Sequence, residues 1–212
     1  MVEEHKVEKD MKLKYLWLFV VCVLSCCKGG DDASDIYPSI VTEFAMIQTD
    51  ASGAMTQLTT DDGRSFVITN PQSGFAPKAR FRVVCGYVAD GQSVTLHHAT
   101  GAYLLRDSTA VAHEPDPVKV TSVWQSGRFV NMQLAPLTQG GIQYWGFRVE
   151  GVSSRTHHIS LHHRQNADPL SYTQTIYASI SVDSLKSVPS GDSIALHIST
   201  FQGDQVWTFK KP

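Results

Sequence analysis

The chain of 212 residues is poor in cysteine, lacks a long apolar run and shows no helical periodicity. Its four cysteines are too few for a disulfide framework, so the fold must depend on a hydrophobic core. The longest apolar run, Tyr15 to Cys27, is shorter than the roughly 20 residues that a membrane-spanning helix requires. Because no stretch repeats apolar residues at the helical period, the core has to come from β-strands.

Motifs of common catalytic machinery are also missing. Gly91-Gln92-Ser93-Val94-Thr95 lacks the second glycine of a nucleophile elbow. Prolines follow His113-Glu114 and forbid the helix of a zinc-protease motif. The net charge of -2 offers no attraction for nucleic acid. We therefore predict a protein that is not an enzyme, with no catalytic residue, no cofactor, no metal site and no nucleic-acid partner.

The amino-terminal segment has the order of an export signal. A basic stretch with Lys12 and Lys14 precedes an apolar run from Tyr15 to Leu24. The tetrapeptide that follows, Val23-Leu24-Ser25-Cys26, is similar to the lipobox of a bacterial lipoprotein, in which the cysteine thiol receives a diacylglycerol. The sequence therefore predicts lipid attachment at Cys26, and a membrane as a partner through this anchor.

Translation is expected to start at Met11 rather than Met1. The ten residues before Met11 include four acidic side chains, whereas the region before the apolar core of a signal should be positive. We accordingly predict a signal peptide within residues 1–25 and a lipid-attached linker over 26–34. Detection of Glu3 or Glu4 in the unprocessed precursor would contradict the later start.

From residue 35 onward the sequence is typical of an antiparallel, all-β protein. Runs rich in Val, Ile, Thr, Phe and Tyr alternate with Gly, Pro, Asn and Asp. In one run, Phe81, Val83, Cys85 and Tyr87 alternate with Arg80, Arg82, Val84 and Gly86, which places the first set on one sheet face. The predicted strands of this part are 41–48, 54–60, 65–69, 79–87, 93–99 and 102–105. Five or six short strands within 35–105 predict a small barrel.

A polar, proline-containing segment over residues 106–117 is predicted to link the barrel to a second domain over 118–212. Strands are expected there at 118–124, 129–134, 143–150, 157–163, 175–182, 193–201 and 205–210. Seven strands, with Trp124, Trp145 and Trp207 to fill the middle, predict a β-sandwich of two sheets.

Several motifs resemble those of one bacterial family. Asp35-Ile36-Tyr37-Pro38-Ser39-Ile40-Val41-Thr42-Glu43-Phe44 and Thr60-Asp61-Asp62-Gly63 resemble the amino-terminal domain of NigD-like lipoproteins of Bacteroidetes. Pro117-Val118-Lys119-Val120-Thr121-Ser122-Val123-Trp124 and Thr200-Phe201-Gln202-Gly203 resemble the carboxyl-terminal domain. The resemblance covers nearly all of the mature chain. It implies an OB-like barrel followed by an immunoglobulin-like β-sandwich.

The resemblance also implies attachment to the outer membrane of the cell envelope, facing the periplasm or the cell surface. The family takes its name from a bacteriocin-associated operon, and its members have no established activity, so no partner-binding residue can be transferred. We expect a non-enzymatic binding module with an unknown envelope or extracellular partner. The alternative is an accessory lipoprotein that binds or processes surface glycans. That alternative needs exposed Trp or Tyr side chains in a concave patch, together with paired carboxylates.

Histidines are concentrated between residues 157 and 163, so a metal site has to be considered. In a strand, His158 and His162 would lie about 13 Å apart, too far to share one metal ion unless a neighbouring strand contributes a ligand. We expect instead that Ile159 and Leu161 face the core, while His158, Ser160, His162 and Arg164 line the solvent face. Such a ridge could form a weak surface for anionic ligands, because residues 118–212 carry a net charge of +3.

Overall fold

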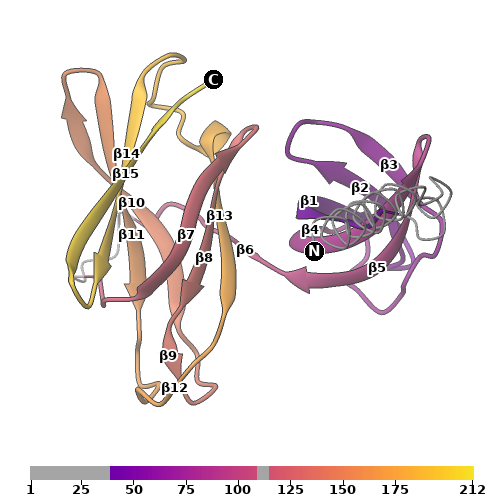
Figure 1. The fold of residues 1–212 in the computed structure, drawn as a ribbon, viewed down its shortest axis with the longest axis horizontal. Coiled ribbons are helices and arrows are strands. Elements are labelled where there is room, and N and C mark those ends of the chain that lie inside the picture. Colours follow the sequence, from indigo (N-terminus) through magenta and orange to yellow (C-terminus); the bar gives the residue numbers. More distant parts are fainter. Residues whose placement is uncertain (1–38, 109–114) are drawn as a thin grey trace, which may run out of the picture. The chain divides into compact units, whose positions relative to one another are not determined.

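The computed structural model describes residues 39–108 and 115–212 (Figure 1). The predicted all-β class is confirmed, because the helical content of these ranges is a single 3-10 turn, Val182–Ser184. No helix in them is long and apolar enough to cross a membrane. The predicted signal peptide, Met11, Cys26 and the linker 26–34 lie outside the described residues.

The amino-terminal half folds as the predicted OB-like barrel. Its strands are β1 (Val41–Thr49), β2 (Met55–Thr60), β3 (Ser65–Ile68), β4 (Arg80–Asp90) and β5 (Ser93–Gly101). They pair in the order β1-β2-β3-β5-β4, and β4 pairs with β1 to close the barrel (Figure 1). Closure removes free sheet edges, so every strand has hydrogen-bonded neighbours on both sides.

The barrel interior follows the period of two that the sequence shows. Val83, Cys85 and Tyr87 belong to the apolar cluster inside the barrel, and partly buried Phe81 packs against it, so the predicted face is confirmed. Cys85 is fully buried, and this burial raises the pKa of its thiol to about 12. The thiol is therefore protonated and unreactive at neutral pH.

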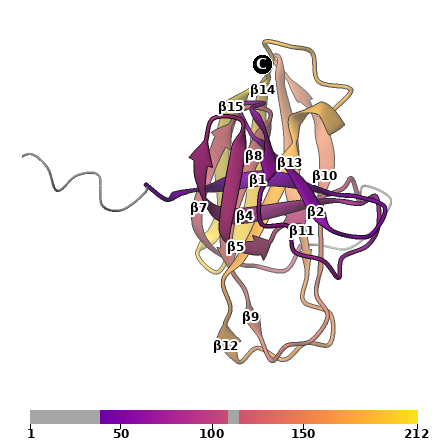
Figure 2. The same cartoon turned by 90° about the vertical axis from the view of Figure 1, so that its right-hand side faces the viewer.

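The carboxyl-terminal half is a two-sheet sandwich (Figures 1 and 2). One sheet has the order β10-β11-β14-β15 and the other the order β6-β13-β8-β7. The strands are β6 (Tyr103–Leu104), β7 (Lys119–Ser126), β8 (Phe129–Ala135), β10 (Tyr144–Ser153), β11 (Thr156–Arg164), β13 (Ile176–Ser181), β14 (Ser193–Thr200) and β15 (Gly203–Lys210).

The sandwich core lies between these two sheets. Fully buried side chains such as Phe147, Ile159 and Leu196 come from one sheet, and Met132 and Ile180 come from the other. Removing large apolar side chains from water is the main source of stability in such a core. The sandwich core therefore consists of apolar side chains that pack between the two sheets.

Two details of the strand pairing differ from the predictions. The strand expected at 102–105 as part of the barrel is β6, and it pairs with β13 of the sandwich. Pairing is also not purely antiparallel, because β3–β5, β6–β13 and β11–β14 are parallel. Parallel partners require a long crossover between them, and the composition of short strands does not reveal such connections.

Two small loops project from one end of the sandwich. They contain the short strands β9 (Leu137–Thr138) and β12 (Tyr172–Thr173), which pair with each other at the end of the sandwich (Figures 1 and 2). Buried Asp168 joins the loops, because its carboxylate accepts hydrogen bonds from the Thr138 hydroxyl, the backbone N–H groups of Gln139 and Gly141, and the Gln143 amide. These donors, the Thr138 hydroxyl first, lower the pKa of Asp168 to about 2.

Replacing Asp168 with asparagine is expected to lower the melting temperature by several degrees at neutral pH, because an amide cannot accept all four hydrogen bonds. The pKa of Asp168 is lower in the folded chain, about 2, than its ordinary value of 3.8. Its stabilising contribution is therefore complete above the ordinary value and is lost as the pH falls toward 2. Melting curves of the two proteins should converge between pH 4 and 2.

The matched control is Asp90→Asn, since Asp90 is exposed at the end of β4. This variant should melt with the parent protein at every pH. A difference between the parent and Asp168→Asn that stays constant down to pH 2 would contradict the role given to the ionised carboxylate.

Candidate functional site

A cavity of about 650 Å³ opens among the described residues of β4, β5 and β6. Its volume falls within the range of small-molecule binding sites. Part of the wall comes from the barrel: the loop before β4, the first residues of β4 and the end of β5. The other part comes from β6 and from the segment that leads into β13. The large side chains on this wall are Phe75, Phe81, Tyr103, Leu104 and Ile176.

Apolar side chains stay exposed in this cavity. Phe75, Tyr103 and Leu104 are 38%, 50% and 42% exposed. Phe75 packs against Phe81 with ring centroids 5.8 Å apart, and Tyr103 stacks on Trp145 at 6.3 Å. Exposed aromatic side chains that line a concave surface are typical of a binding site, because a ligand can cover them.

The loop that carries Phe75 is held by hydrogen bonds to the β1–β2 turn. The Thr49 hydroxyl donates to the Ala76 carbonyl at 2.7 Å, and the Lys78 N–H donates to the Asp50 carbonyl at 2.8 Å. Gly53 allows the approach, since a Cβ on it would lie 2.2 Å from the Phe75 carbonyl oxygen. Phe75 is therefore part of a preformed wall.

The polar groups of the cavity include a cation without a counter-ion. Arg80 is exposed at the start of β4, and no ion pair or side-chain hydrogen bond joins it to another described residue. Gln72 and Gln174 add amide groups on the same wall. This combination is suited to a ligand that has an apolar or aromatic body and an anionic group.

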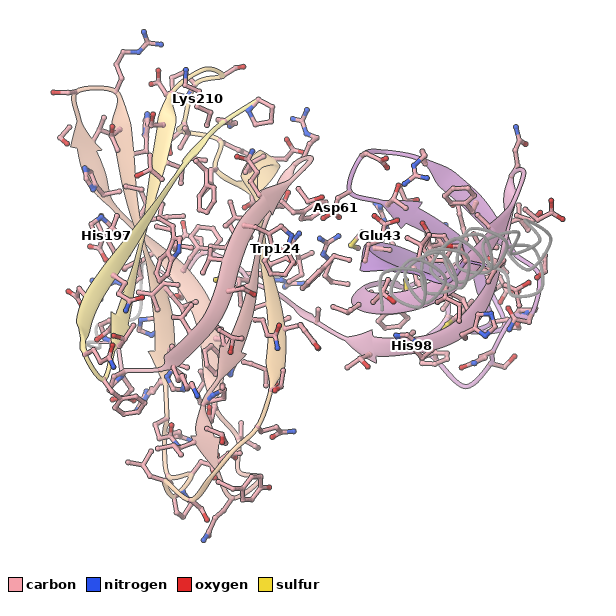
Figure 3. The ribbon with its side chains drawn as sticks, in the orientation of Figure 1. Glu43, Asp61, His98, Trp124, His197 and Lys210 are labelled. Carbon is pink, nitrogen blue, oxygen red and sulfur yellow. The ribbon has the colours of Figure 1, made fainter. Side chains whose placement is uncertain are left out.

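A second arginine of the wall, Arg82, belongs to a buried polar network. Its guanidinium group donates two hydrogen bonds to Asp61, at 2.6 and 2.9 Å, and others to Asn131 and Ser179. The Asn131 amide donates to Asp61 as well, at 2.9 Å. Figure 3 labels Asp61, which lies in the turn between β2 and β3. Two of the four residues come from the barrel and two from the sandwich, so the network joins the two halves of residues 40–212.

The surroundings of Arg82 exclude water. The side chains of Arg82 and Asp61 are 0% and 2% exposed, and the Phe129 ring lies 3.9 Å from the guanidinium carbon. Because Asp61 already neutralises Arg82, this arginine is not available to a ligand. It forms a rigid boundary of the cavity instead.

The histidine-rich strand β11 has a different exposure pattern from the predicted one. Ile159 and Leu161 face the core as predicted, but His162, expected on the solvent face, is buried. His163 is buried too: it stacks on Trp145 at 4.0 Å, and its pKa is lowered by burial. Period-two alternation identifies a second sheet face but does not show that other segments cover it. The predicted ridge for anionic ligands is therefore incomplete.

A neighbouring strand does approach His158, as a metal site would require. His158 Nδ1 lies 2.9 Å from Nε2 of His197 on β14, and His158 Nε2 lies 2.9 Å from the Ser153 hydroxyl (Figure 3 labels His197). Over the described ranges, no three His, Cys, Asp or Glu side chains are placed to hold a metal ion. The contact is explained by a hydrogen bond between two rings, one of which donates.

The three tryptophans of the sandwich do not share one exposed surface. Trp124 packs edge-on against Phe44, Trp145 lies between Tyr103 and His163, and Trp207 packs against the core (Figure 3 labels Trp124). The tryptophans therefore supply no shared platform for a glycan, whereas exposed Tyr103 lies in the cavity, so the glycan alternative stays open.

The sequence did not identify the residues that form the cavity. Phe75 and Tyr103 lie in a loop and a two-residue strand, where no periodicity marks a side chain as functional. Arg82 was placed on the sheet face opposite Val83, yet it is buried. A signal was present at Asp61, since it belongs to the Thr60-Asp61-Asp62-Gly63 motif, but that motif was used only for the family resemblance.

Comparison with solved structures places this architecture among Bacteroidetes proteins. A NigD-like immunity protein from Bacteroides caccae superposes with a TM-score of 0.61 at 21% identity, over 82% of this chain and 93% of the other. A candidate toxin-related protein from Parabacteroides distasonis gives 0.63 at 16%, over 81% and 93%. A candidate lipoprotein from Bacteroides fragilis gives 0.57 at 11%, over 82% and 99%.

Sequence comparison adds nothing to this: no family model and no curated protein match the chain. At these identities the likeness establishes the fold alone. The chain has the two-part, all-β fold of the NigD-like structure, and the predicted resemblance is confirmed at that level. These three structures are described as an immunity protein, a toxin-related protein and a lipoprotein.

Proposed function

We propose that the protein is a non-enzymatic binding module of the bacterial cell envelope, attached to the outer membrane by lipid on Cys26. Its ligand has an apolar or aromatic body with an anionic group, and it binds in the cavity between Phe75, Phe81 and Tyr103. The observation that carries this proposal is the preformed cavity, in which aromatic side chains and Arg80 remain exposed.

Two features support binding rather than catalysis. The cavity wall contains no histidine, cysteine, aspartate or glutamate among the described residues, so the side chains that most often act as general bases are missing from it. The wall is also held rigidly, by the Arg82 network on one side and by the loop hydrogen bonds of Thr49 on the other. A rigid site loses little conformational entropy when a ligand binds.

Membrane attachment is supported by the lipobox-like sequence, and its test is chemical. Mass spectrometry of the protein from its native membrane should show acyl groups on Cys26. An unmodified cysteine at the amino terminus of the mature protein would overturn this part of the proposal.

A link with bacteriocin immunity is a further proposal from the family resemblance. A deletion strain with unchanged sensitivity to neighbouring strains would contradict it.

Ligand binding can be measured with anilinonaphthalene sulfonate, a fluorescent anion with an aromatic body. The chain from residue 27 onward, without lipid, should enhance its fluorescence. Tyr103→Ser removes an aromatic wall and should weaken binding roughly tenfold, the equivalent of about 1.4 kcal/mol. Arg80→Gln should weaken it roughly threefold, because an exposed ion pair contributes less than about 1 kcal/mol.

The matched control is Tyr172→Ser. Tyr172 is as exposed as Tyr103, 55% against 50%, but it lies outside the cavity. Equal losses of affinity for the two variants would place the probe elsewhere on the surface. They would contradict the assignment of the cavity.

A further inference from the structure

The two loops at the β9–β12 end of the sandwich expose large apolar side chains. Ile142 is 74% exposed, Leu170 is 64%, Tyr144 is 57% and Tyr172 is 55%. We call these four residues the loop tip. Figures 1 and 2 both show the β9 and β12 loops beyond the ends of the longer strands, so this surface can approach a flat partner without obstruction from the sheets.

Polar groups around the loop tip are paired inside the loops. Asp168 accepts from the N–H groups of Gln139 and Gly141, and the Gly140 N–H donates to the Thr138 hydroxyl at 2.8 Å. The Gln165 amide donates to the Leu137 and Asp168 carbonyls, both at 2.8 Å. Internal pairing matters because an unpaired backbone group is costly to transfer out of water.

Ionised groups are almost absent from this surface. Residues 136–144 contain no Asp, Glu, Lys or Arg, and residues 165–175 contain only Asp168, which is buried and fully hydrogen-bonded. Arg164 is the nearest cation along the chain. It lies opposite Tyr144 in the β10–β11 ladder, at the base of the loops. A lipid surface accepts such a tip without electrostatic attraction, and tyrosine is favoured at the boundary between lipid and water.

We propose that the loop tip inserts shallowly into a phospholipid bilayer, so that Ile142 and Leu170 enter the lipid and Tyr144 and Tyr172 lie at its boundary. This proposal rests on the proposed function, because it assumes that the chain is attached to a membrane through Cys26. A chain anchored through Cys26 meets the bilayer at high effective concentration, so a weak second contact is occupied. The lipid anchor holds the protein at the membrane, and the loop tip orients the sandwich on it.

The test uses the chain from residue 26 to 212, tethered by an amino-terminal histidine tag to nickel-chelating lipid in phosphatidylcholine vesicles. This tether makes the result independent of acylation. Cys26→Ser and Cys27→Ser leave buried Cys85, and Ser171→Cys introduces an NBD fluorophore between Leu170 and Tyr172. The control label is Ser187→Cys, which is exposed in the loop after the 3-10 turn.

Tethering should reduce iodide quenching of the label at 171 roughly threefold and leave the label at 187 unchanged. The double variant Ile142→Ser and Leu170→Ser should restore full quenching at 171. Protection should persist from low to high salt, because no cation contributes to it.

Equal quenching of both labels on tethered protein would overturn the insertion. So would protection that requires anionic lipid and disappears in salt, or protection of untethered protein that grows with protein concentration, which would indicate a second copy of the chain. A parent protein with unmodified Cys26 in its native membrane would refute the anchor and leave the insertion result standing.

Discussion

Arg82→Ala is expected to lower the free energy of unfolding by about 3–5 kcal/mol, because it leaves the buried carboxylate of Asp61 without its partner. Hydrogen bonds from Arg82 to Asn131 and Ser179 are lost at the same time. For a chain of this size the loss corresponds to roughly 6–20 °C in melting temperature. Urea unfolding followed by circular dichroism measures the change directly.

The control for Arg82 is another arginine–aspartate pair of the barrel. Arg64 pairs with Asp62 at 2.8 Å, but both side chains are more than half exposed. Arg64→Ala should therefore change stability by less than about 1 kcal/mol. Arg82→Lys should remain strongly destabilised, since a lysine cannot reproduce the planar fork that reaches Asp61 and Asn131 together. Similar stabilities for Arg82→Ala and Arg64→Ala would contradict the structural role of the network.

Gly127→Ala is expected to be the next most damaging substitution. Gly127 lies in the turn between β7 and β8 with a φ of +51°, and a Cβ on it would lie 1.8 Å from the Asp61 carbonyl oxygen. The left-handed backbone costs roughly 1–2 kcal/mol for a residue with a Cβ. The clash adds roughly 1–3 kcal/mol, because the Asp61 backbone would have to move away from the new Cβ.

Gly91→Ala measures the first of these effects alone, and its difference from Gly127→Ala measures the clash. Gly91 has a similar φ of +58°, but nothing lies within 4 Å of the position that a Cβ on it would occupy. Thermal melting should show a small loss for Gly91→Ala and a clearly larger one for Gly127→Ala. Equal losses of stability would contradict the predicted clash between a Cβ at position 127 and the Asp61 carbonyl.

Much of the fold could be predicted because its long strands repeat apolar residues at a period of two. Strand β4 is an example, since Phe81, Val83, Cys85 and Tyr87 were placed on one sheet face, and this face packs into or against the barrel core. The opposite face was predicted less well. Arg82 is buried there because it contacts β8 and β13, which are far away in the sequence.

The candidate site was mostly beyond sequence reasoning for the same reason. Cavity residues Phe75 and Tyr103 lie in a loop and a two-residue strand, and neither segment is long enough to show a period. His162 was wrongly placed on the solvent face, and no exposure was predicted for His163. A strand pattern does not reveal which segments cover the second face of the strand. Contacts between distant segments define both the cavity and the burial of these histidines.

Arg82 and Ser179 are 97 positions apart, one in the barrel and one in the sandwich, so we expect their hydrogen bond to form late in folding. Hairpin contacts such as those of β1–β2 and β7–β8 connect much shorter stretches of chain, and we expect them to form earlier. Interactions that are absent from the folding transition state slow unfolding and leave the folding rate nearly unchanged. We therefore expect the hydrogen bonds from Arg82 to Asn131 and Ser179 to slow unfolding more than they speed folding.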